Sequence, residues 1–153
     1  RVQMSIIRFF RIDTAFSDIE LPSYQTTGSA GMDIRAAVST PLTVAAKGFV
    51  KVPTNLNVEI PEGYEIQVRP RSSLAAKHGV TILNAPGTID SDYRGEIGIL
   101  LINHGEKPYT IERGERVAQL VVAKVEQIKV EESKEPLSQT ERGEGGFGST
   151  GKH

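Results

Sequence analysis

Residues 142–151 are of types that can surround a phosphate group. The segment contains five glycines together with Arg142, Phe147, Ser149 and Thr150. Glycines let backbone N–H groups approach phosphate oxygens closely, and an arginine binds such oxygens with paired donors. A Gly-rich terminal segment is more often simply disordered, so residue types alone leave a flexible end and a phosphate-binding loop as alternatives.

Residues 146–152 also fit the pattern G-x-x-x-x-G-K, which begins the Walker A phosphate-binding loop. That loop follows a strand, needs a serine or threonine after the lysine, and leads into a helix. His153 takes the hydroxyl position here. We therefore attribute the match to glycine content.

A second segment, residues 84–95, carries an amide, two carboxylates and a phenol between two turn signals. These groups belong to Asn84, Asp90, Asp92 and Tyr93. Pro-Gly and Arg-Gly pairs mark turns at its ends, so the ordinary interpretation is a hairpin with solvated acids. The functional interpretation is that one aspartate, fixed by the turn, orients a water molecule as a general base.

A third segment, residues 69–75, has two arginines and two serines where a helix is expected to begin. Ser72 and Ser73 are typical helix-capping residues, and we expect at least one of them to cap. A helix start with free N–H groups, a hydroxyl and the adjacent Arg71 is also suited to an anion. Both interpretations can hold together.

The composition restricts the kinds of site. The 153 residues suit one domain, and 18 Lys and Arg against 19 Asp and Glu give a net charge of −1. We therefore expect neither stable nucleic-acid binding nor membrane binding. The absence of cysteine excludes disulfides and thiolate chemistry, and three distant histidines do not predict a metal site. No long apolar run or secretory signal is visible, which predicts a cytoplasmic protein.

Short β-rich runs separated by glycine and proline predict an all-β fold, either a sandwich, a jelly roll or a small barrel. One short helix is expected at Ser72–His78, between a hydroxyl residue and Gly79. The expected strands are Ile6–Ile12, Met32–Ala36, Gly48–Pro53, Leu56–Ile60, Tyr64–Val68, Thr81–Leu83, Gly95–Asn103, Tyr109–Ile111 and Val117–Val125.

Two of these strands, at residues 97–102 and 120–123, are apolar on both faces. A strand buried on both faces needs cover on both, which one small sandwich supplies poorly and an oligomer would supply. We expect a folded domain over residues 1–128, a charged arm over 129–141 and a flexible Gly-rich lid over 142–153.

Five segments of the chain together resemble, in sequence and in order, the five motifs of the trimeric dUTPase family. They are Ser29-Ala30-Gly31-Met32-Asp33, Pro70-Arg71-Ser72-Ser73, Gly87-Thr88-Ile89-Asp90-Ser91-Asp92-Tyr93, Gly114-Glu115-Arg116-Val117-Ala118-Gln119 and Arg142-Gly143-Glu144-Gly145-Gly146-Phe147-Gly148. One such motif would be weak evidence, whereas five in order are specific.

The resemblance implies a distorted jelly-roll or β-barrel subunit in a homotrimer. Three active sites would lie at subunit boundaries, each with phosphate-binding segments from one subunit, a nucleoside pocket from a second and a closing tail from the third. The implied activity is Mg²⁺-dependent hydrolysis of dUTP to dUMP and pyrophosphate by water attack on the α-phosphorus. This reaction limits uracil incorporation into DNA and supplies dUMP for thymidylate synthesis.

The resemblance also implies roles for particular residues. Asp90 is similar to the base that orients the attacking water. Tyr93 is similar to the ring beneath deoxyribose that leaves no room for a 2′-hydroxyl, and Asn84 to the amide that reads the uracil edge. Asp33 resembles a carboxylate that holds water on the Mg²⁺ ion.

The remaining implied contacts are with the phosphates and the lid. Arg71, Ser72 and Gln119 resemble phosphate contacts. Arg142 resembles the γ-phosphate contact and Phe147 the ring that stacks on uracil, with hydroxyl donors from Ser149 and Thr150. The other implied substrate-binding positions are Ser73, Gly87, Thr88, Ile89 and Gly148.

Two other functions compete with this one. The related dCTP deaminases place a catalytic glutamate in the strand after the third motif, where this chain has Ile99-Leu100-Leu101-Ile102. The Asp92-Tyr93 pair also fits the dUTPase pattern better, so deamination is disfavoured. A non-catalytic jelly-roll binding module is the other alternative, and it predicts no turnover.

Overall fold

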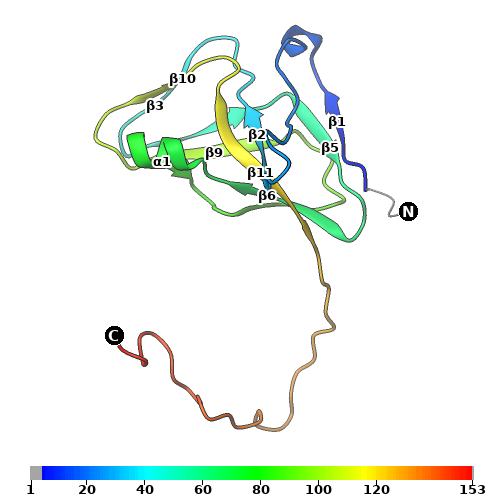
Figure 1. Ribbon diagram of the computed structural model, residues 1–153, viewed down its shortest axis with the longest axis vertical. Coiled ribbons are helices and arrows are strands. Elements are labelled where there is room, and N and C mark those ends of the chain that lie inside the picture. The colour runs from blue at the N-terminus through cyan, green and yellow to red at the C-terminus, as the bar shows by residue number, and fades with distance from the viewer. Residues whose placement is uncertain (1–4, 153) are drawn as a thin grey trace.

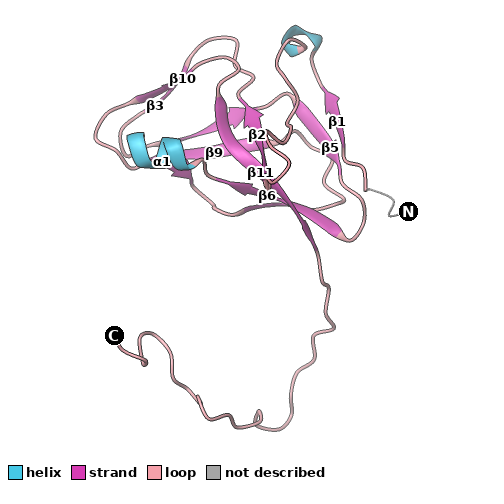
Figure 2. Ribbon diagram, viewed as in Figure 1, coloured by secondary structure: helices cyan, strands magenta, loops and turns pink. Residues whose placement is uncertain are grey.

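The computed structural model describes residues 5–152, and the regular structure of this part of the chain consists almost entirely of short antiparallel strands joined by loops (Figures 1 and 2). One α-helix and one 3-10 helix interrupt them. The elements are β1 (Arg8–Arg11), η1 (Thr14–Phe16), β2 (Gly31–Arg35), β3 (Leu42–Val44), β4 (Phe49–Pro53), β5 (Leu56–Glu59), β6 (Tyr64–Arg69), α1 (Ser72–His78), β7 (Val80–Ile82), β8 (Gly87–Ile89), β9 (Gly98–Asn103), β10 (Tyr109–Ile111) and β11 (Arg116–Lys124).

The strands form two main sheets and two strand pairs. The larger sheet has the order β2-β11-β6-β8, and the smaller has the order β4-β9-β7. The pairs β1-β5 and β10-β3 complete the body. The segment from β7 to β8 leads from the smaller sheet to the edge of the larger one, so the residues after β7 lie where the two sheets meet.

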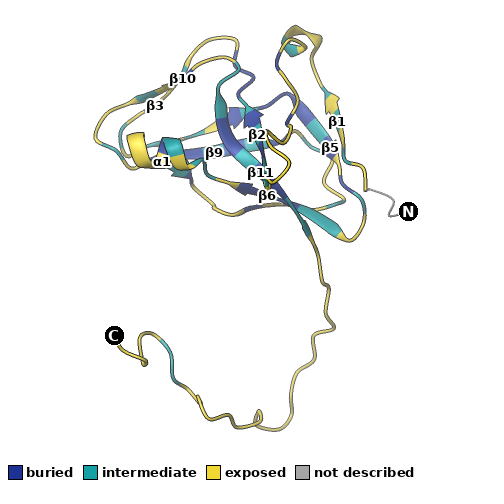
Figure 3. Cartoon of the chain, in the orientation of Figure 1, coloured by how far each residue is buried: buried dark blue, intermediate teal, exposed yellow. Residues whose placement is uncertain are grey.

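The core lies between the sheets and follows the alternation of each strand (Figure 3). Ile66 and Leu120 of the larger sheet and Ile99 of the smaller are fully buried. Leu100 and Ile102, on the outer face of β9, remain half-buried in a single copy of the chain. The doubly apolar strands are therefore only partly covered by the chain itself.

The all-β architecture with one short helix is confirmed, and each expected strand overlaps an observed one. The strand expected from Gly95 begins only at Gly98. Two strands were not predicted, β3 and β8. Sequence patterns place the β8 residues in a loop, because a three-residue strand that begins with glycine has weak strand propensity. Pairing with β6 stabilises β8 as a strand although its residues have low strand propensity.

The start of α1 corrects one prediction. Neither Ser72 nor Ser73 caps the helix: both lie inside its first turn, and the N-cap is Arg71, which makes no side-chain capping hydrogen bond. Arg71 has the extended backbone of an N-cap residue, with φ −90° and ψ 130°, so the helix begins one residue too early for either serine to cap. Its C-terminal end is as expected, with Gly79 in the left-handed region at φ 68°.

After β11 the chain leaves the body and runs away from it without strand or helix (Figure 1). The described residues of this segment are almost all exposed (Figure 3). Its last backbone contact with the body is the hydrogen bond from Val125 N–H to the Gly63 carbonyl, 2.9 Å. The division into a domain, an arm and a lid stays a prediction.

Candidate active site

A cavity of about 180 Å³ lies beneath the loop that joins β7 to β9. It is lined by Val68, Asn84, Gly87, Thr88, Ile89, Tyr93, Glu96, Ile97, Gly98 and Leu100. All five residues of this segment predicted to bind the nucleoside are among them. We name this cavity the hairpin cavity after the hairpin expected over residues 84–95, although β8 pairs with β6 and not with a neighbour in sequence. The loop contains a cis peptide bond between Ala85 and Pro86.

Gly87 fits this cavity because it has no side chain. A Cβ atom there would lie 3.1 Å from Val68 Cβ and 3.4 Å from the Asn84 amide nitrogen. The first distance is tighter than ordinary van der Waals contact, so a larger residue would displace the wall and the Asn84 amide together.

Tyr93 forms another wall of the cavity. Its hydroxyl donates a hydrogen bond of 2.8 Å to the backbone carbonyl of Glu96. The ring lies against Gly95, where a Cβ atom would overlap it. Because the residue is 45% exposed, these local contacts rather than deep burial hold the ring.

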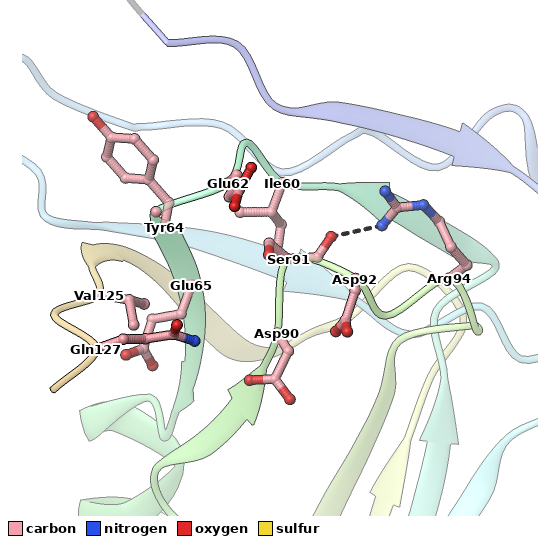
Figure 4. A pocket seen from close by; sticks show the side chains of 11 residues that line it. Ile60, Glu62, Tyr64, Glu65, Asp90, Ser91, Asp92, Arg94, Val125 and Gln127 are labelled. Atoms are coloured by element: carbon pink, nitrogen blue, oxygen red, sulfur yellow. Dashed lines mark hydrogen bonds between the residues drawn. The ribbon is translucent and has the colours of Figure 1, made fainter. Parts of the chain in front are cut away.

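Asp90 stands at the end of β8, next to this cavity. The N–H of Tyr93 donates to the Asp90 carbonyl at 3.1 Å, which closes a tight turn around Asp90 and Asp92. Figure 4 shows the Asp90 carboxylate pointing away from the contact between Arg94 and the Ser91 carbonyl, which measures 2.7 Å. Asp90 is exposed and, within residues 5–152, its carboxylate makes no hydrogen bond or ion pair. Its oxygens are therefore open to hydrogen bonds from water.

The hollow beside Asp90 is larger, with a volume of about 800 Å³. Its side chains come from the β5–β6 turn, from the Asp90 turn and from the residues after β11 (Figure 4). Glu62, Glu65 and Asp92 join Asp90 on its surface, with Arg94 as the basic residue. In one copy, this hollow supplies little positive charge for a phosphate.

A separate cluster, which we name the arginine cluster, contains Asp33, Arg71 and Arg116. Asp33 lies between the two guanidinium groups: Arg71 Nε is 3.4 Å from one carboxylate oxygen, and Arg116 Nη1 is 3.4 Å from the other. Arg71 also donates to the Arg116 carbonyl at 3.1 Å. The Asp33 carboxylate holds the two guanidinium groups close together, which places two positive charges side by side.

Gln119 and the two serines border the arginine cluster. The Gln119 amide donates to the Pro70 carbonyl at 3.0 Å and lies over Gly31, where a Cβ atom would overlap it. Ser72 and Ser73 follow Arg71 directly, and Ser72 is exposed. The structure thus places the predicted phosphate contacts of the second and fourth motifs next to Asp33 of the first motif.

Behind Arg71 lies a second polar contact, between Tyr109 and Glu115. The Tyr109 hydroxyl donates to a Glu115 carboxylate oxygen at 2.8 Å, and the Tyr109 ring packs on His78 with centroids 4.8 Å apart. Burial, together with Glu115, raises the pKa of Tyr109 to about 12, although the charge of Arg71 acts in the opposite direction. This phenol stays protonated at neutral pH.

Within one copy, Asp90 and the arginine cluster are far apart. The strand register places Asp90 level with Glu65, and Asp33 level with Arg69. That offset along β6 amounts to about 13 Å, and the three strand spacings from β8 to β2 add about 14 Å at right angles. The backbones at Asp90 and at Asp33 are therefore about 20 Å apart.

The tail residues lie apart from both groups (Figure 1). Arg142 Nε donates to the Gly145 carbonyl at 2.8 Å, and Ser149 packs near Gly145. Phe147 is fully exposed, with φ 50°. Tail residues from Thr140 to Thr150 line a shallow hollow of their own. In this conformation Arg142, Phe147, Gly148, Ser149 and Thr150 do not reach the cavity.

The donor set suits a magnesium ion held mainly by substrate. Within residues 5–152, no group of three or more His, Asp or Glu side chains could hold a metal ion by itself. Mg²⁺ usually keeps several waters and binds phosphate oxygens with one or two carboxylates. Asp33, whose carboxylate is only 21% exposed and lies between two arginines, fits the role of accepting hydrogen bonds from such waters.

Three residues with evident positions in the site were not predicted: Gly95, Glu96 and Arg116. Arg116 and Glu96 are ordinary charged residues in sequence, and their contacts join residues 83 and 42 positions apart. Arg116 does stand within the fourth motif, and its place there was the only available signal. Gly95 reads as a turn residue, whereas its contact with the Tyr93 ring appears only in three dimensions.

The fold and these groups define a β-sheet domain with the parts of a nucleotide-binding site: a small cavity, an exposed carboxylate and an arginine cluster. A family model described as dUTPase matches residues 17–151. The chain belongs to the dUTPase family.

Relatives with similar sequences carry one name. The chain is 53% identical to the deoxyuridine 5′-triphosphate nucleotidohydrolase of Fusobacterium nucleatum subsp. nucleatum over 152 residues, which cover 99% of each protein. It is 57% identical to the protein of the same name from Rhizobium rhizogenes over 135 residues, covering 87% of this chain and 86% of the relative.

Solved structures agree on the fold. The Staphylococcus bacteriophage 80alpha dUTPase, solved with dUPNHPP, superimposes with a TM-score of 0.85 at 26% identity, covering 97% of this chain and 99% of that one. A mutant dUTPase of phage phi11 of S. aureus, described with a structural Mg(II) ion, has a TM-score of 0.75 at 21% identity, covering 87% and 99%. The jelly-roll fold is therefore confirmed. None of the helices in the described part of the chain is long and apolar enough to span a membrane.

Proposed function

We propose that this protein hydrolyses dUTP to dUMP and pyrophosphate. The observation that carries the proposal is the loop around β8, where a cavity of about 180 Å³ lies beside an exposed aspartate in a tight turn. Membership of the dUTPase family and two relatives named deoxyuridine 5′-triphosphate nucleotidohydrolase support it. In the cell, the reaction would limit uracil incorporation into DNA and supply dUMP for thymidylate synthesis. We place it in the cytoplasm.

Asp90 acts as the general base. Its carboxylate accepts a proton from a water molecule, whose oxygen attacks the α-phosphorus. The bond from that phosphorus to the oxygen bridging to the β-phosphate breaks, and pyrophosphate leaves with the electron pair. A triphosphate carries close to four negative charges, so the reaction needs charge stabilisation and alignment more than covalent help.

The hairpin cavity selects the nucleoside. Asn84 reads the uracil edge, and the tight cavity wall formed with Gly87, Thr88 and Ile89 excludes a 5-methyl group. The Tyr93 ring packs beneath deoxyribose and leaves no room for a 2′-hydroxyl. The short contact that a Gly87 side chain would make with Val68 supports a wall with little space to spare.

The phosphate contacts come from a second copy of the chain. Arg71, Ser72, Ser73 and Gln119 bind the triphosphate in a homotrimer with three shared sites. The separation of about 20 Å between Asp90 and the arginine cluster within one copy supports this arrangement. The half-covered outer face of β9 supports oligomer formation as well.

Mg²⁺ is the proposed cofactor, with Asp33 accepting hydrogen bonds from its waters. When bound to the triphosphate, the ion supplies charge neutralisation and alignment of the phosphates. Asp33 also keeps Arg71 and Arg116 adjacent. One carboxylate would therefore contact both the waters of the Mg²⁺ ion and the two guanidinium groups.

The Gly-rich tail acts as a lid contributed by a third copy. Arg142 contacts the γ-phosphate, Phe147 stacks on uracil, and Ser149 and Thr150 donate hydroxyl hydrogen bonds beside Gly148. The full exposure of Phe147 supports a segment that orders only when a ligand is bound. Closing the lid would exclude bulk water and align the phosphate chain.

Pyrophosphate release from dUTP, UTP, dTTP and dCTP with Mg²⁺ tests the proposal. We expect turnover of dUTP, with UTP and dTTP rejected at the sugar and at the 5-methyl group. Absence of turnover would leave a non-catalytic binding module, and conversion of dCTP would point to a deaminase.

A further inference from the structure

Glu96, which follows the Tyr93 turn, is held by two backbone N–H groups from a distant part of the chain. One of its carboxylate oxygens accepts hydrogen bonds from the N–H of Thr54 (3.2 Å) and of Asn55 (2.9 Å). These two residues form the turn between β4 and β5. A carboxylate bound by two N–H groups makes charge-assisted hydrogen bonds, which are stronger than neutral ones.

The turn that donates these bonds is itself firmly held. Asn55 is only 6% exposed and has φ 64°, a left-handed conformation that asparagine tolerates better than most residues. Its amide donates to the Asp13 carbonyl at 2.9 Å and accepts from the Asp13 N–H at 2.8 Å. Glu96 is therefore attached to a rigid part of the body.

Glu96 also holds Tyr93, through its main chain. The Glu96 carbonyl accepts the hydrogen bond from the Tyr93 hydroxyl, and both residues line the hairpin cavity. Since Tyr93 is 45% exposed, its ring depends on this bond and on Gly95 for its position. A shift of the Glu96 backbone would move the ring within the cavity.

We infer that Glu96 is a positioning residue for sugar selection. Its carboxylate ties the Tyr93 turn to the β4–β5 turn, and so keeps the Tyr93 ring where a 2′-hydroxyl would collide with it. The inference rests on the proposed role of Tyr93 in dUTP recognition. Selection by steric exclusion requires a rigid wall, which the residues supporting that wall must supply.

The neighbouring contacts should confine the effect of losing the Glu96 carboxylate to the Tyr93 turn. Ile97 N–H donates to the Leu56 carbonyl at 2.8 Å, and the Thr54 hydroxyl donates to the Ile97 carbonyl at 2.6 Å. These bonds do not involve the Glu96 carboxylate. Its removal should therefore leave β9 in place and loosen mainly residues 93–96.

Binding of dUMP and UMP, measured by calorimetry, tests the inference without relying on hydrolysis. We expect Glu96→Ala to reduce the preference for dUMP over UMP about ten-fold, the effect of one lost anchoring contact. Glu96→Gln should keep the preference, because its amide oxygen can accept both N–H bonds. Glu59→Ala is the matched control, since Glu59 is an exposed carboxylate at the end of β5 and forms its ion pair with Arg8 of β1.

A double-mutant cycle shows whether Glu96 acts through Tyr93. Tyr93→Phe removes the hydroxyl that donates to the Glu96 carbonyl. The variant that carries both Tyr93→Phe and Glu96→Ala should therefore lose no more of the preference for dUMP over UMP than either single variant. Glu96→Asp, whose side chain is one methylene shorter, should repeat the alanine result and replaces it if that variant does not fold.

Three results would overturn the inference: an unchanged preference in Glu96→Ala, additive losses in the cycle, or a wild-type protein that binds UMP as well as dUMP. Failure of the proposed function would look different. A wild-type protein that prefers dUMP but releases no pyrophosphate from dUTP would contradict hydrolysis while leaving the role of Glu96 supported.

Discussion

Asp90 and Asp92 stand two positions apart in one turn, and the proposed chemistry needs only one of them as a base. Asp90 follows directly on β8, so the strand fixes its backbone. Asp92 lies in the middle of the turn that the Tyr93 N–H closes onto the Asp90 carbonyl. A base fixed by a paired strand is better placed to orient water than one within a turn.

Replacing Asp90 with asparagine should therefore remove catalysis without unfolding the protein. We expect kcat for dUTP to fall by about 10²–10⁴-fold, the usual range for a lost general base. The melting temperature should stay near the wild-type value, because the side chain is exposed. Asp92→Asn is the matched comparison and should lower kcat far less. Equal losses of kcat at both positions would contradict the assignment of Asp90 as the general base.

Sequence motifs predicted most residues of the proposed site but not the contacts that hold them. Asp33 and Arg71 stand in separate motifs, and only strand pairing reveals that Arg116 completes their cluster. Glu96 gives no signal in sequence, since its partners lie in another turn. Motifs report which chemical groups are needed, whereas supporting contacts depend on the register of distant strands.

At the scale of elements, β8 shows the limit of propensity. Its three residues, Gly87–Ile89, are bounded by turn signals and lack the long apolar run that marked strands such as β9 and β11. Pairing with β6 makes the segment a strand, and so sets the position of the cavity wall. The long strands were predictable because their burial follows local sequence, while β8 forms only in the tertiary context.

The lid hypothesis concerns the tail as an element. Removing residues 142–153 should leave the fold and oligomeric state unchanged, because the described part of the tail contacts only itself. Most of the dUTP turnover should disappear, measured as pyrophosphate release. A matched variant, Phe147→Ala, should weaken substrate binding while keeping the rest of the lid. Undiminished activity in the truncated protein would contradict the lid hypothesis and indicate that the tail is an ordinary disordered terminus.

The contact between β10 and the start of β11 predicts a dependence of stability on pH. The pKa of Tyr109 is raised from 10.0 to about 12, so the unfolded chain loses this proton before the folded one does. The contribution to the free energy of unfolding is complete below pH 10 and is lost as the pH rises toward 12.

Ultraviolet titration checks this prediction. A late phase of tyrosine ionisation should appear near pH 12, and Tyr109→Phe should remove it. Tyr24→Phe is the control, because Tyr24 is 52% exposed and its removal should leave the late phase unchanged. A late phase that survives in Tyr109→Phe would contradict the assignment.

At the scale of the whole molecule, one chain holds all the groups of the proposed site but does not bring them together. The hairpin cavity and Asp90 lie at the β8 edge of the larger sheet, and the arginine cluster lies about 20 Å away. The tail extends from the body (Figure 1). Two different surfaces that meet head to tail can close into a ring of identical copies. A threefold ring would complete three sites at once.

The central claim is that Asp90 of one copy works with Arg71 of another on the same dUTP molecule. The most direct test is to co-express Asp90→Asn and Arg71→Ala chains, each inactive alone, and to measure dUTP turnover of the mixed oligomers. With equal amounts and random mixing, about a quarter of the sites combine an intact Asp90 with an intact Arg71, so about a quarter of wild-type activity should return. Activity no greater than that of the two variants alone would show that each site lies within a single copy, and would contradict the account.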